Sequence, residues 1–221
     1  MNKLKKFFSK MRGINILKTI YVNFAYFPLG IAIKLPVFVY GKVEIKVNGL
    51  ILISPSHLRP GILNIGTPIL GYQHSKEHTC FNIKGKMSVN GKVIFGKGCS
   101  IEVGHNAVLN IGDDTIITGN TTISCSKEIT IGNRCMISLD NLIMDNDWHN
   151  IVAVDGGYIF PKKAQIVIGN HVWICCRCTI LKGTNIGNDS IVASNSKLTK
   201  TIEGHNILIG SNTILKTNVT W

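Results

Sequence analysis

The sequence contains few acidic residues and little proline. Its 221 residues include 12 Asp and Glu against 24 Lys and Arg, which gives a formal net charge of +12, and only 6 residues are proline. The seven cysteines lack the paired spacing of secreted disulfide frameworks, which favours reduced thiols in the cytoplasm. The charged fraction of 16% is low for a helical bundle, and no glycine-rich phosphate loop is present. These absences exclude a disulfide scaffold and the common nucleotide-binding loops.

Residues 1–42 carry eight basic residues and no acidic one. We predict a basic helical segment over residues 1–36, whose first amphipathic helix has the apolar side chains Leu4, Phe7, Phe8 and Met11. The uncharged run 19–33 is too short to span a bilayer, and no signal-peptide cleavage site follows it. Two roles fit the segment. Residues 1–24 would contact anionic lipid at the inner face of the cytoplasmic membrane, or the helix would pack against the end of the next domain.

An aliphatic residue recurs every six positions near the C-terminus. On an α-helix six residues turn by about 240°, so successive members of this ladder would share no face. The residue four positions after each ladder residue is mostly small. The ladder consists of Ile168, Ile174, Ile180, Ile186, Val192 and Leu198. This period is typical of short strands that stack into a β-solenoid.

The ladder also occupies the middle of the chain, with shifts of two residues that keep the same side chains facing inward. Its earlier members are Ile83, Val89, Phe95, Ile101, Val103, Leu109, Ile111, Ile117, Ile123, Ile129, Ile131, Ile137 and Ile143. Glycine with Asn or Asp marks the corners, where these residues tolerate positive φ. We therefore predict an all-β fold, a parallel solenoid over residues 37–221 that ends in a C-terminal tail at 206–221.

A polar loop, residues 144–166, interrupts the ladder. It contains Asp145-Asn146-Asp147-Trp148-His149. A solenoid gains nothing by extruding a long loop, whereas polar loops on rigid scaffolds often carry the chemistry of an enzyme. An isolated histidine is usually structural, but two acids, an aromatic residue and the break in the ladder make His149 the candidate catalytic residue.

The loop and two further segments resemble the hexapeptide-repeat acyltransferases. These segments are Ile168-Gly169-Asn170-His171-Val172-Trp173-Ile174 and Ile180-Leu181-Lys182-Gly183-Thr184-Asn185-Ile186-Gly187. The likeness is greatest to the maltose and galactoside O-acetyltransferases and to the O-acetyltransferases of capsule and O-antigen clusters, and it is strong over residues 83–205. It implies a left-handed parallel β-helix, an exception to the right-handed crossover rule, in a homotrimer with active sites between subunits. It also implies acetyl-CoA as the acyl donor, without a metal.

In such an enzyme His149 is the expected general base, because a sugar hydroxyl becomes a good nucleophile only as its proton is removed. Asp147, Asp145 or a backbone carbonyl would orient the imidazole. Trp148 is expected on the acceptor side. Asn120 is expected either to bind the acceptor or to stabilise the oxyanion, although it also fits a residue that caps a turn. The resemblance places the oxyanion donor at a backbone N–H near Cys176 of the neighbouring subunit.

The resemblance further implies that coenzyme A lies along the C-terminal coils. The expected contact residues are Trp173, Cys176, Ser194, Thr199, Lys200 and Lys216. Trp173 would flank the pantetheine arm or brace the His149 loop. The chain departs from the family at Cys175, where glycine is usual, and near Gly210, where the usual Gly-x-Pro-Ala-Lys is missing.

The expected function is acetyl-CoA-dependent O-acetylation of a sugar hydroxyl in a surface polysaccharide or its lipid-linked precursor. N-acetylation of a nucleotide-linked amino sugar would use the same scaffold and base, and it stays open. A non-catalytic solenoid predicts uninterrupted coils with regular Thr or Asn arrays. Nucleic-acid binding is disfavoured because no basic groove has interleaved aromatic residues. A metal site is disfavoured because Cys175-Cys176-x-Cys178 lacks a second pair of ligands.

Overall fold

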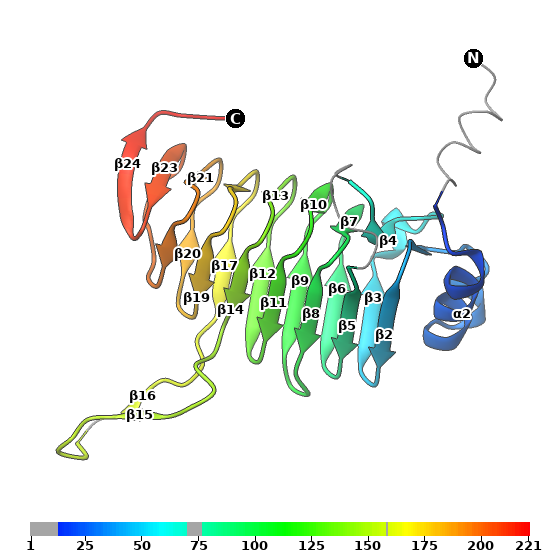
Figure 1. The fold of residues 1–221 in the computed structure, drawn as a ribbon, viewed down its shortest axis with the longest axis horizontal. Helices are drawn as coiled ribbons and strands as arrows, with labels where there is room; N and C mark the ends of the chain where they lie inside the picture. The colour runs from blue at the N-terminus through cyan, green and yellow to red at the C-terminus, as the bar shows by residue number, and fades with distance from the viewer. Residues whose placement is uncertain (1–12, 70–76, 158) are drawn as a thin grey trace.

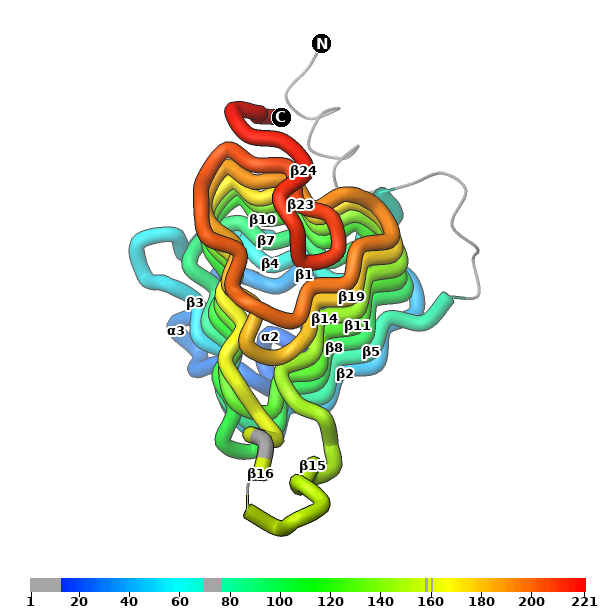
Figure 2. Tube along the Cα trace, turned by 90° about the vertical axis from the view of Figure 1, so that its left-hand side faces the viewer, coloured from blue at the N-terminus to red at the C-terminus, as the bar shows by residue number. Residues whose placement is uncertain are grey.

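The structure, a computed structural model, describes residues 13–69, 77–157 and 159–221. Its body is a solenoid whose three sheets form the faces of a triangular prism (Figure 1 and Figure 2). The chain visits the three sheets in turn, so each coil adds one strand to each sheet, in parallel with the strand of the previous coil. The predicted fold class, an all-β left-handed parallel β-helix, is confirmed.

The strands are short. Sheet I contains β1 (Val37–Val39), β4 (Leu63–Thr67), β7 (Val93–Gly96), β10 (Thr115–Ile117), β13 (Met136–Ile137), β18 (Trp173–Ile174), β21 (Ile191–Val192), β23 (Ile207–Gly210) and β24 (Thr213–Thr217). Sheet II contains β2 (Val43–Val47), β5 (Thr79–Ile83), β8 (Ser100–Val103), β11 (Thr122–Cys125), β14 (Leu142–Met144), β19 (Thr179–Leu181) and β22 (Lys197–Leu198). Sheet III contains β3 (Leu50–Ile53), β6 (Lys86–Val89), β9 (Val108–Ile111), β12 (Glu128–Ile131), β17 (Ile166–Ile168) and β20 (Asn185–Ile186).

The aliphatic ladder forms the core of the prism. All its predicted members are at most 2% exposed. In sheet II they stack in register from coil to coil, in the order Ile101, Ile123, Ile143, Ile180 and Leu198. Burial of this continuous column removes apolar surface from water along the whole solenoid, which is the main source of its stability.

The corners between sheets III and I are held by a column of side-chain amides and one carboxylate. The Oδ1 atom of Asp113 accepts the backbone N–H of Lys92 in the previous coil at 2.6 Å. Asn133, Asn170 and Asn188 continue the column, each accepting one backbone N–H of the coil before at 2.7–2.8 Å. The residue after each of these four has positive φ: Asp114, Arg134, His171 and Asp189 in turn. The predicted turns are thus corners, but the positive φ falls on an arginine and a histidine as well as on aspartates.

The corner between sheets II and III differs in length from coil to coil. It spans two residues at 84–85, four at 104–107 and two at 126–127, and it then expands to the loop 145–165. The predicted loop 144–166 is therefore correct to one residue at each end, because Met144 still belongs to β14 and Ile166 to β17. From β5 onward in the described residues, the longest connection between two strands of the three sheets lies at this edge of the prism.

The N-terminal end of the solenoid is covered by helices α2 (Ile16–Tyr26) and α3 (Leu29–Ala32). Asn23 of α2 is buried and bonds to both the N–H and the carbonyl of Val37, and Thr19 accepts the N–H of Val39. The helix thus replaces a further strand beside β1. The predicted helix with Leu4, Phe7, Phe8 and Met11 lies outside the described residues.

The C-terminal end is closed by a strand instead. The segment 206–221 was expected to be a tail, but it contains β23 and β24, and β24 turns back to pair antiparallel with β23. All five residues of β24 are exposed. Within the described part of the chain, no helix has the length and apolar character needed to cross a bilayer.

Candidate active site

The loop 145–165 leaves the prism at the corner between sheets II and III, and its outer part is the antiparallel hairpin of β15 (Ile151–Val152) and β16 (Ile159–Phe160). Figure 2 shows the hairpin standing well away from the stacked coils. An antiparallel bridge between Asn146 and Lys163 closes the base of the loop. The loop is therefore a two-stranded projection whose base is fixed by the Asn146–Lys163 bridge. The candidate residue His149 lies between this base and the outer hairpin.

Asp145 is the root of the loop, and it is completely buried. Its two carboxylate oxygens accept three consecutive backbone N–H groups of the preceding corner, at 2.7–2.8 Å: those of Ser126, Lys127 and Glu128. A buried carboxylate needs such donors to offset its lost hydration. Asp145 thus holds two coils together. The prediction that it orients the imidazole of His149 is corrected, because both its oxygens are already engaged.

Asp147 points to a lysine of the following coil. Its Oδ2 lies 2.6 Å from the Nζ of Lys182, and neither side chain is more than 25% exposed. The same ammonium group donates to the carbonyl of Pro161 on the returning arm. The backbone N–H of Asp147 donates to the carbonyl of Lys162 at 3.0 Å. Lys182 therefore clamps both arms of the loop, and the expected carboxylate–imidazole bond of Asp147 gives way to this ion pair.

His149 is exposed at the outer end of this clamped turn. Its backbone N–H donates to the carbonyl of Asp147 at 2.7 Å, and Trp148 between them has φ of 63°. Asn146 supports the turn by accepting the N–H of Trp148 at 2.9 Å. In the portion of the chain that the structure describes, no carboxylate bonds to the imidazole of His149. The ring is thus accessible to a substrate.

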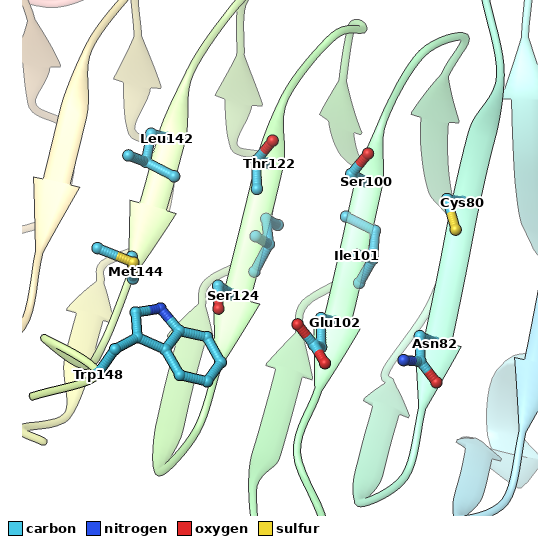
Figure 3. A pocket seen from close by; sticks show the side chains of 11 residues that line it. Cys80, Asn82, Ser100, Ile101, Glu102, Thr122, Ser124, Leu142, Met144 and Trp148 are labelled. Atoms are coloured by element: carbon cyan, nitrogen blue, oxygen red, sulfur yellow. The ribbon is translucent and has the colours of Figure 1, made fainter.

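A groove of about 410 Å³ runs along the outer face of sheet II beside this turn. Its floor comes from four consecutive strands, β5, β8, β11 and β14, and the Trp148 side chain stands at its loop end (Figure 3). The lining includes Cys80, Asn82, Ser100, Glu102, Thr122, Ser124, Leu142 and Met144. Because side chains alternate along a strand, these residues face outward while the ladder residues fill the core.

The chemistry of the groove changes along its length. Figure 3 shows an apolar end at Leu142, Met144 and Trp148, followed by hydroxyl, carboxylate and amide groups toward Asn82. Glu102 is half-exposed and lies 3.7 Å from the ammonium of Lys84. An aromatic wall with short polar side chains suits a ligand that has both apolar C–H faces and hydroxyl groups. A sugar ring has this character.

Two of the expected cofactor residues lie together at another corner. Cys176 and Ser194 line a surface pocket of about 400 Å³ between sheets I and II, with Asp140, Arg177 and Asn195. Arg177 is exposed and lies 3.8 Å from a carboxylate oxygen of Asp140. The structure thus brings Cys176 and Ser194 together in successive coils, beside a guanidinium group that suits an anionic ligand.

Three of the other four expected cofactor residues, Thr199, Lys200 and Lys216, are dispersed. Thr199 and Lys200 follow β22 at the same edge as the loop, two coils later, and both are exposed. The N–H and Oγ1 of Thr199 bond to the side chain of Asn212, each at 2.8 Å. Lys216 is exposed on β24. These residues do not form one pocket with Cys176 within the chain.

Trp173 lies on sheet I, not beside the loop. Its indole N–H donates to the Oγ of Ser138 at 3.0 Å, and its ring lies 5.9 Å from that of Trp221. Trp221 in turn stacks on His171, with ring centroids 4.6 Å apart. Trp173 therefore does not brace the His149 loop of its own chain. The contacts of its ring are with Ser138, which follows β13 of sheet I, and with Trp221 at the C-terminus.

Asn120 is exposed at the corner between sheets I and II and has positive φ. Asp140, Arg177 and Asn195 have the same backbone conformation at the same corner of the next three coils. Its N–H donates to the carbonyl of Lys97 at 3.1 Å. This geometry is that of a turn residue, and it separates Asn120 from His149 by the width of sheet II.

No group of three or more His, Cys, Asp or Glu side chains in the described residues has an arrangement that could hold a metal ion. The seven cysteines are free thiols. Burial raises the pKa of the Cys99 thiol to about 12 and that of Cys178 to about 11. Both thiols are inert core residues at neutral pH.

Two residues that shape the site were not predicted. Lys182 clamps the loop, and Asn146 is buried at its base, where it also donates to the Oγ of Ser126 at 2.8 Å. Both residues belong to the segments that carry the family resemblance: Asn146 to the loop motif that begins at Asp145, and Lys182 to the run Ile180–Gly187. Their partners are 20 and 35 residues away in sequence, so only the stacking of coils shows their roles.

Comparison with protein families gives a match to the bacterial transferase hexapeptide family (six repeats) at residues 165–200. This segment begins just before β17 and ends just after β22, and it contains Lys182, Trp173 and Cys176. Its six-residue period agrees with the buried ladder of the same coils. The match covers less than half of the chain, and it agrees with the coils that the structure shows over the same residues.

Two relatives with similar sequences are O-acetyltransferases. The chain is 30% identical over 122 residues to the polysialic acid O-acetyltransferase of Neisseria meningitidis, covering 42% of this chain and 57% of that protein. It is 30% identical over 125 residues to the galactoside O-acetyltransferase of Escherichia coli K12, covering 55% of this chain and 56% of that one. The chain thus spans a little more than half the length of these relatives.

Among solved structures, the chain resembles the polySia-specific acetyltransferase NeuO. The TM-score is 0.56 at 20% sequence identity, and the alignment covers 81% of this chain and 88% of that one. At this identity the likeness establishes the fold, which is the β-helix described above.

Proposed function

We propose that this protein transfers an acetyl group from acetyl-CoA to a sugar hydroxyl of a surface polysaccharide or of its lipid-linked precursor. The observation that carries the proposal is the position of His149, an exposed imidazole on a clamped turn next to the Trp148 wall of the groove on sheet II. The groove offers an acceptor sugar an apolar face and several hydrogen-bonding groups. The relatives named above are O-acetyltransferases of glycans and galactosides, which supports the same chemistry.

In this reaction His149 is the general base. An imidazole nitrogen accepts the proton of the acceptor hydroxyl while the oxygen forms its bond to the thioester carbonyl carbon. The C–S bond breaks, and the imidazolium returns the proton to the leaving thiolate. Acetyl-CoA supplies the thioester. A backbone N–H near Cys176 is suited to stabilise the charge that develops on the carbonyl oxygen.

A complete site needs a second copy of the chain. His149 lies at one edge of sheet II, and the pocket of Cys176 and Ser194 lies at the opposite edge. The strands between them are two to five residues long, which at about 3.3 Å per residue separates the two edges by roughly 10 Å. A base must be within hydrogen-bond distance of the reacting hydroxyl. We therefore place the site between subunits of a homotrimer, with the histidine and the Cys176 pocket from different copies.

The proposal is tested on the surface polysaccharide of the source organism by NMR. The wild-type strain is compared with one that carries His149→Ala, and O-acetyl and N-acetyl signals are measured separately. Loss of the O-acetyl signals from an otherwise intact polymer is the expected result. Loss of the polymer, or of an N-acetylated sugar, would instead identify an amino-sugar N-acetyltransferase. Unchanged spectra would contradict the proposal that the acceptor is a polysaccharide.

A further inference from the structure

Helix α2 packs one face against β1 and exposes the other. The inner face buries Thr19, Val22 and Asn23. The outer face and the adjoining α3 turn leave large apolar side chains exposed: Ile16, Leu17, Ile20, Tyr21, Phe24, Leu29 and Ile33. Leu17 is 82% exposed and Phe24 is 49% exposed. We call this set the N-terminal apolar face.

The spacing of the outer residues makes one continuous stripe. Ile16, Ile20 and Phe24 follow one another at intervals of four, and Leu17 and Tyr21 lie beside them, as on one side of a helix. Contiguous apolar patches of this size are uncommon on proteins that stay in water, and they mark surfaces that meet a partner or a membrane. Single exposed apolar residues, such as Leu50 on β3, need no such explanation.

The charge around the N-terminal apolar face has one sign. The chain has no acidic residue before Glu44, which pairs with Lys46 at 3.0 Å. Lys34 and Lys42 are exposed near the helices. The sequence adds five more basic residues within residues 1–12. A partner of this region must offer apolar contact and negative charge together.

We propose that the N-terminal apolar face binds the surface of a membrane with anionic headgroups. Helix α2 has 11 residues and lacks the length to span a bilayer, so it lies in the interface with its stripe among the acyl chains and the lysines at headgroup level. Anionic lipid supplies the negative charge that the lysine-rich, acid-free segment lacks. A soluble protein partner would also cover the stripe, but it would need an acidic rim that matches every exposed lysine.

The N-terminal apolar face lies near one end of the groove on sheet II, so membrane binding there would affect access to the groove. Strand β2 lies between the helix and the groove: the Tyr26 hydroxyl donates to the carbonyl of Ile45, and the Lys18 ammonium donates to that of Val43. The next strand, β5, supplies Cys80 and Asn82 at the end of the groove opposite Trp148. A membrane at the N-terminal face would thus adjoin the open end of the groove. This step rests on the proposed function, since it favours an acceptor presented on lipid.

The test is vesicle flotation with the full-length chain in the absence of substrate. One set of vesicles is pure phosphatidylcholine, and the other contains 30% phosphatidylglycerol. We expect flotation with the anionic vesicles, weaker binding at high salt, and at least a tenfold lower partition coefficient for the double variant Leu17→Glu/Phe24→Glu. The matched control Leu215→Glu, at an exposed leucine on β24 at the other end of the solenoid, keeps wild-type binding.

Absence of flotation, or equal flotation of the double variant and wild type, would overturn the proposal. So would a sedimentation experiment in which the double variant loses self-association while wild type ignores vesicles, because the face would then cover a second copy. Circular dichroism of each variant shows that it is folded. The His149→Ala variant separates the two proposals, since it keeps vesicle binding even if the catalytic assignment fails.

Discussion

Two corners at the same edge of the prism differ in what they do. The corner 126–127 is a short turn between β11 and β12, and the loop 145–165 occupies the equivalent place one coil later. The first residue of the loop, Asp145, binds the amides of the earlier corner, whereas His149, four residues on, is exposed. Within this run of charged and aromatic residues, the buried Asp145 joins two coils, whereas the exposed His149 is accessible to a substrate.

Substitution of Asp145, at the root of the loop, has the largest expected effect. Asp145→Ala removes the acceptor of three backbone N–H groups and leaves a hole in a fully buried site. We expect a loss of about 2 kcal/mol in unfolding free energy and a melting temperature lower by about 4–8 °C. Asp155→Ala, at an exposed aspartate of the outer loop, changes neither quantity measurably. Thermal and urea unfolding measure both variants, and equal stability would contradict the capping role.

Loss of the clamp by Lys182 has the second-largest expected effect, a decrease in kcat. Lys182→Met removes the ammonium group that joins Asp147 and Pro161, so the turn of His149 loses its fixed position. We expect kcat to fall about tenfold while the KM for acetyl-CoA is unchanged, because positioning acts on the reacting geometry.

Two further variants test this clamp. Lys182→Arg restores most of kcat because the ion pair can re-form. Asp147→Asn combined with Lys182→Met costs little more than either change alone, since both break one interaction. Additive losses in steady-state kinetics would show that the two residues act separately.

The groove wall gives a smaller effect. Trp148→Ala removes the aromatic end of the groove, and we expect the KM for the acceptor to rise about fivefold, a typical scale for one aromatic contact. The KM for acetyl-CoA stays constant. Ile151→Ala is the matched control, since both side chains are 52% exposed on the same loop but Ile151 does not line the groove. Equal acceptor KM values for the two variants would remove Trp148 from acceptor binding.

The smallest effect concerns thiols. Alkylation requires the thiolate, which forms as the pH approaches the pKa. Since burial holds the pKa of Cys99 near 12 and that of Cys135 near 11, both stay protonated and shielded at pH 8. We expect iodoacetamide to modify the half-buried Cys176 of the folded protein and to leave Cys99 and Cys135 intact, as measured by peptide mass spectrometry. Modification of all three at one rate would contradict the packed core.

The repeating part of the fold follows from the sequence because it depends on backbone periodicity. Every ladder position from Ile83 to Leu198 is buried, and the predicted turns lie at corners of the prism, although positive φ occurs there at Arg134 and His171 as well as at aspartates. The break in the ladder also marks the loop correctly to one residue at each end. Such features need only the period of a coil, which the sequence carries locally.

The contacts between coils could not be predicted in the same way. Asp145 and its amide donors are 17–19 residues apart, and the coils at this edge vary in length, so their alignment is not readable from spacing. The same holds for the clamp by Lys182. The outer stripe of α2 was not predicted, because the polar side chains of Thr19 and Asn23 face inward to bond to β1, and the sequence alone does not show these contacts.

The most direct measurement compares two exposed histidines at the same edge of the solenoid. His105 lies in the corner 104–107, two coils before the loop, and it serves as the control for His149. Purified wild type, His149→Ala and His105→Ala are assayed for acceptor-dependent release of coenzyme A, and acetyl-CoA binding is measured by calorimetry. We expect at least a hundredfold lower turnover for His149→Ala with unchanged acetyl-CoA affinity, and wild-type turnover for His105→Ala. Equal turnover of the two variants would contradict the assignment of His149 as the base.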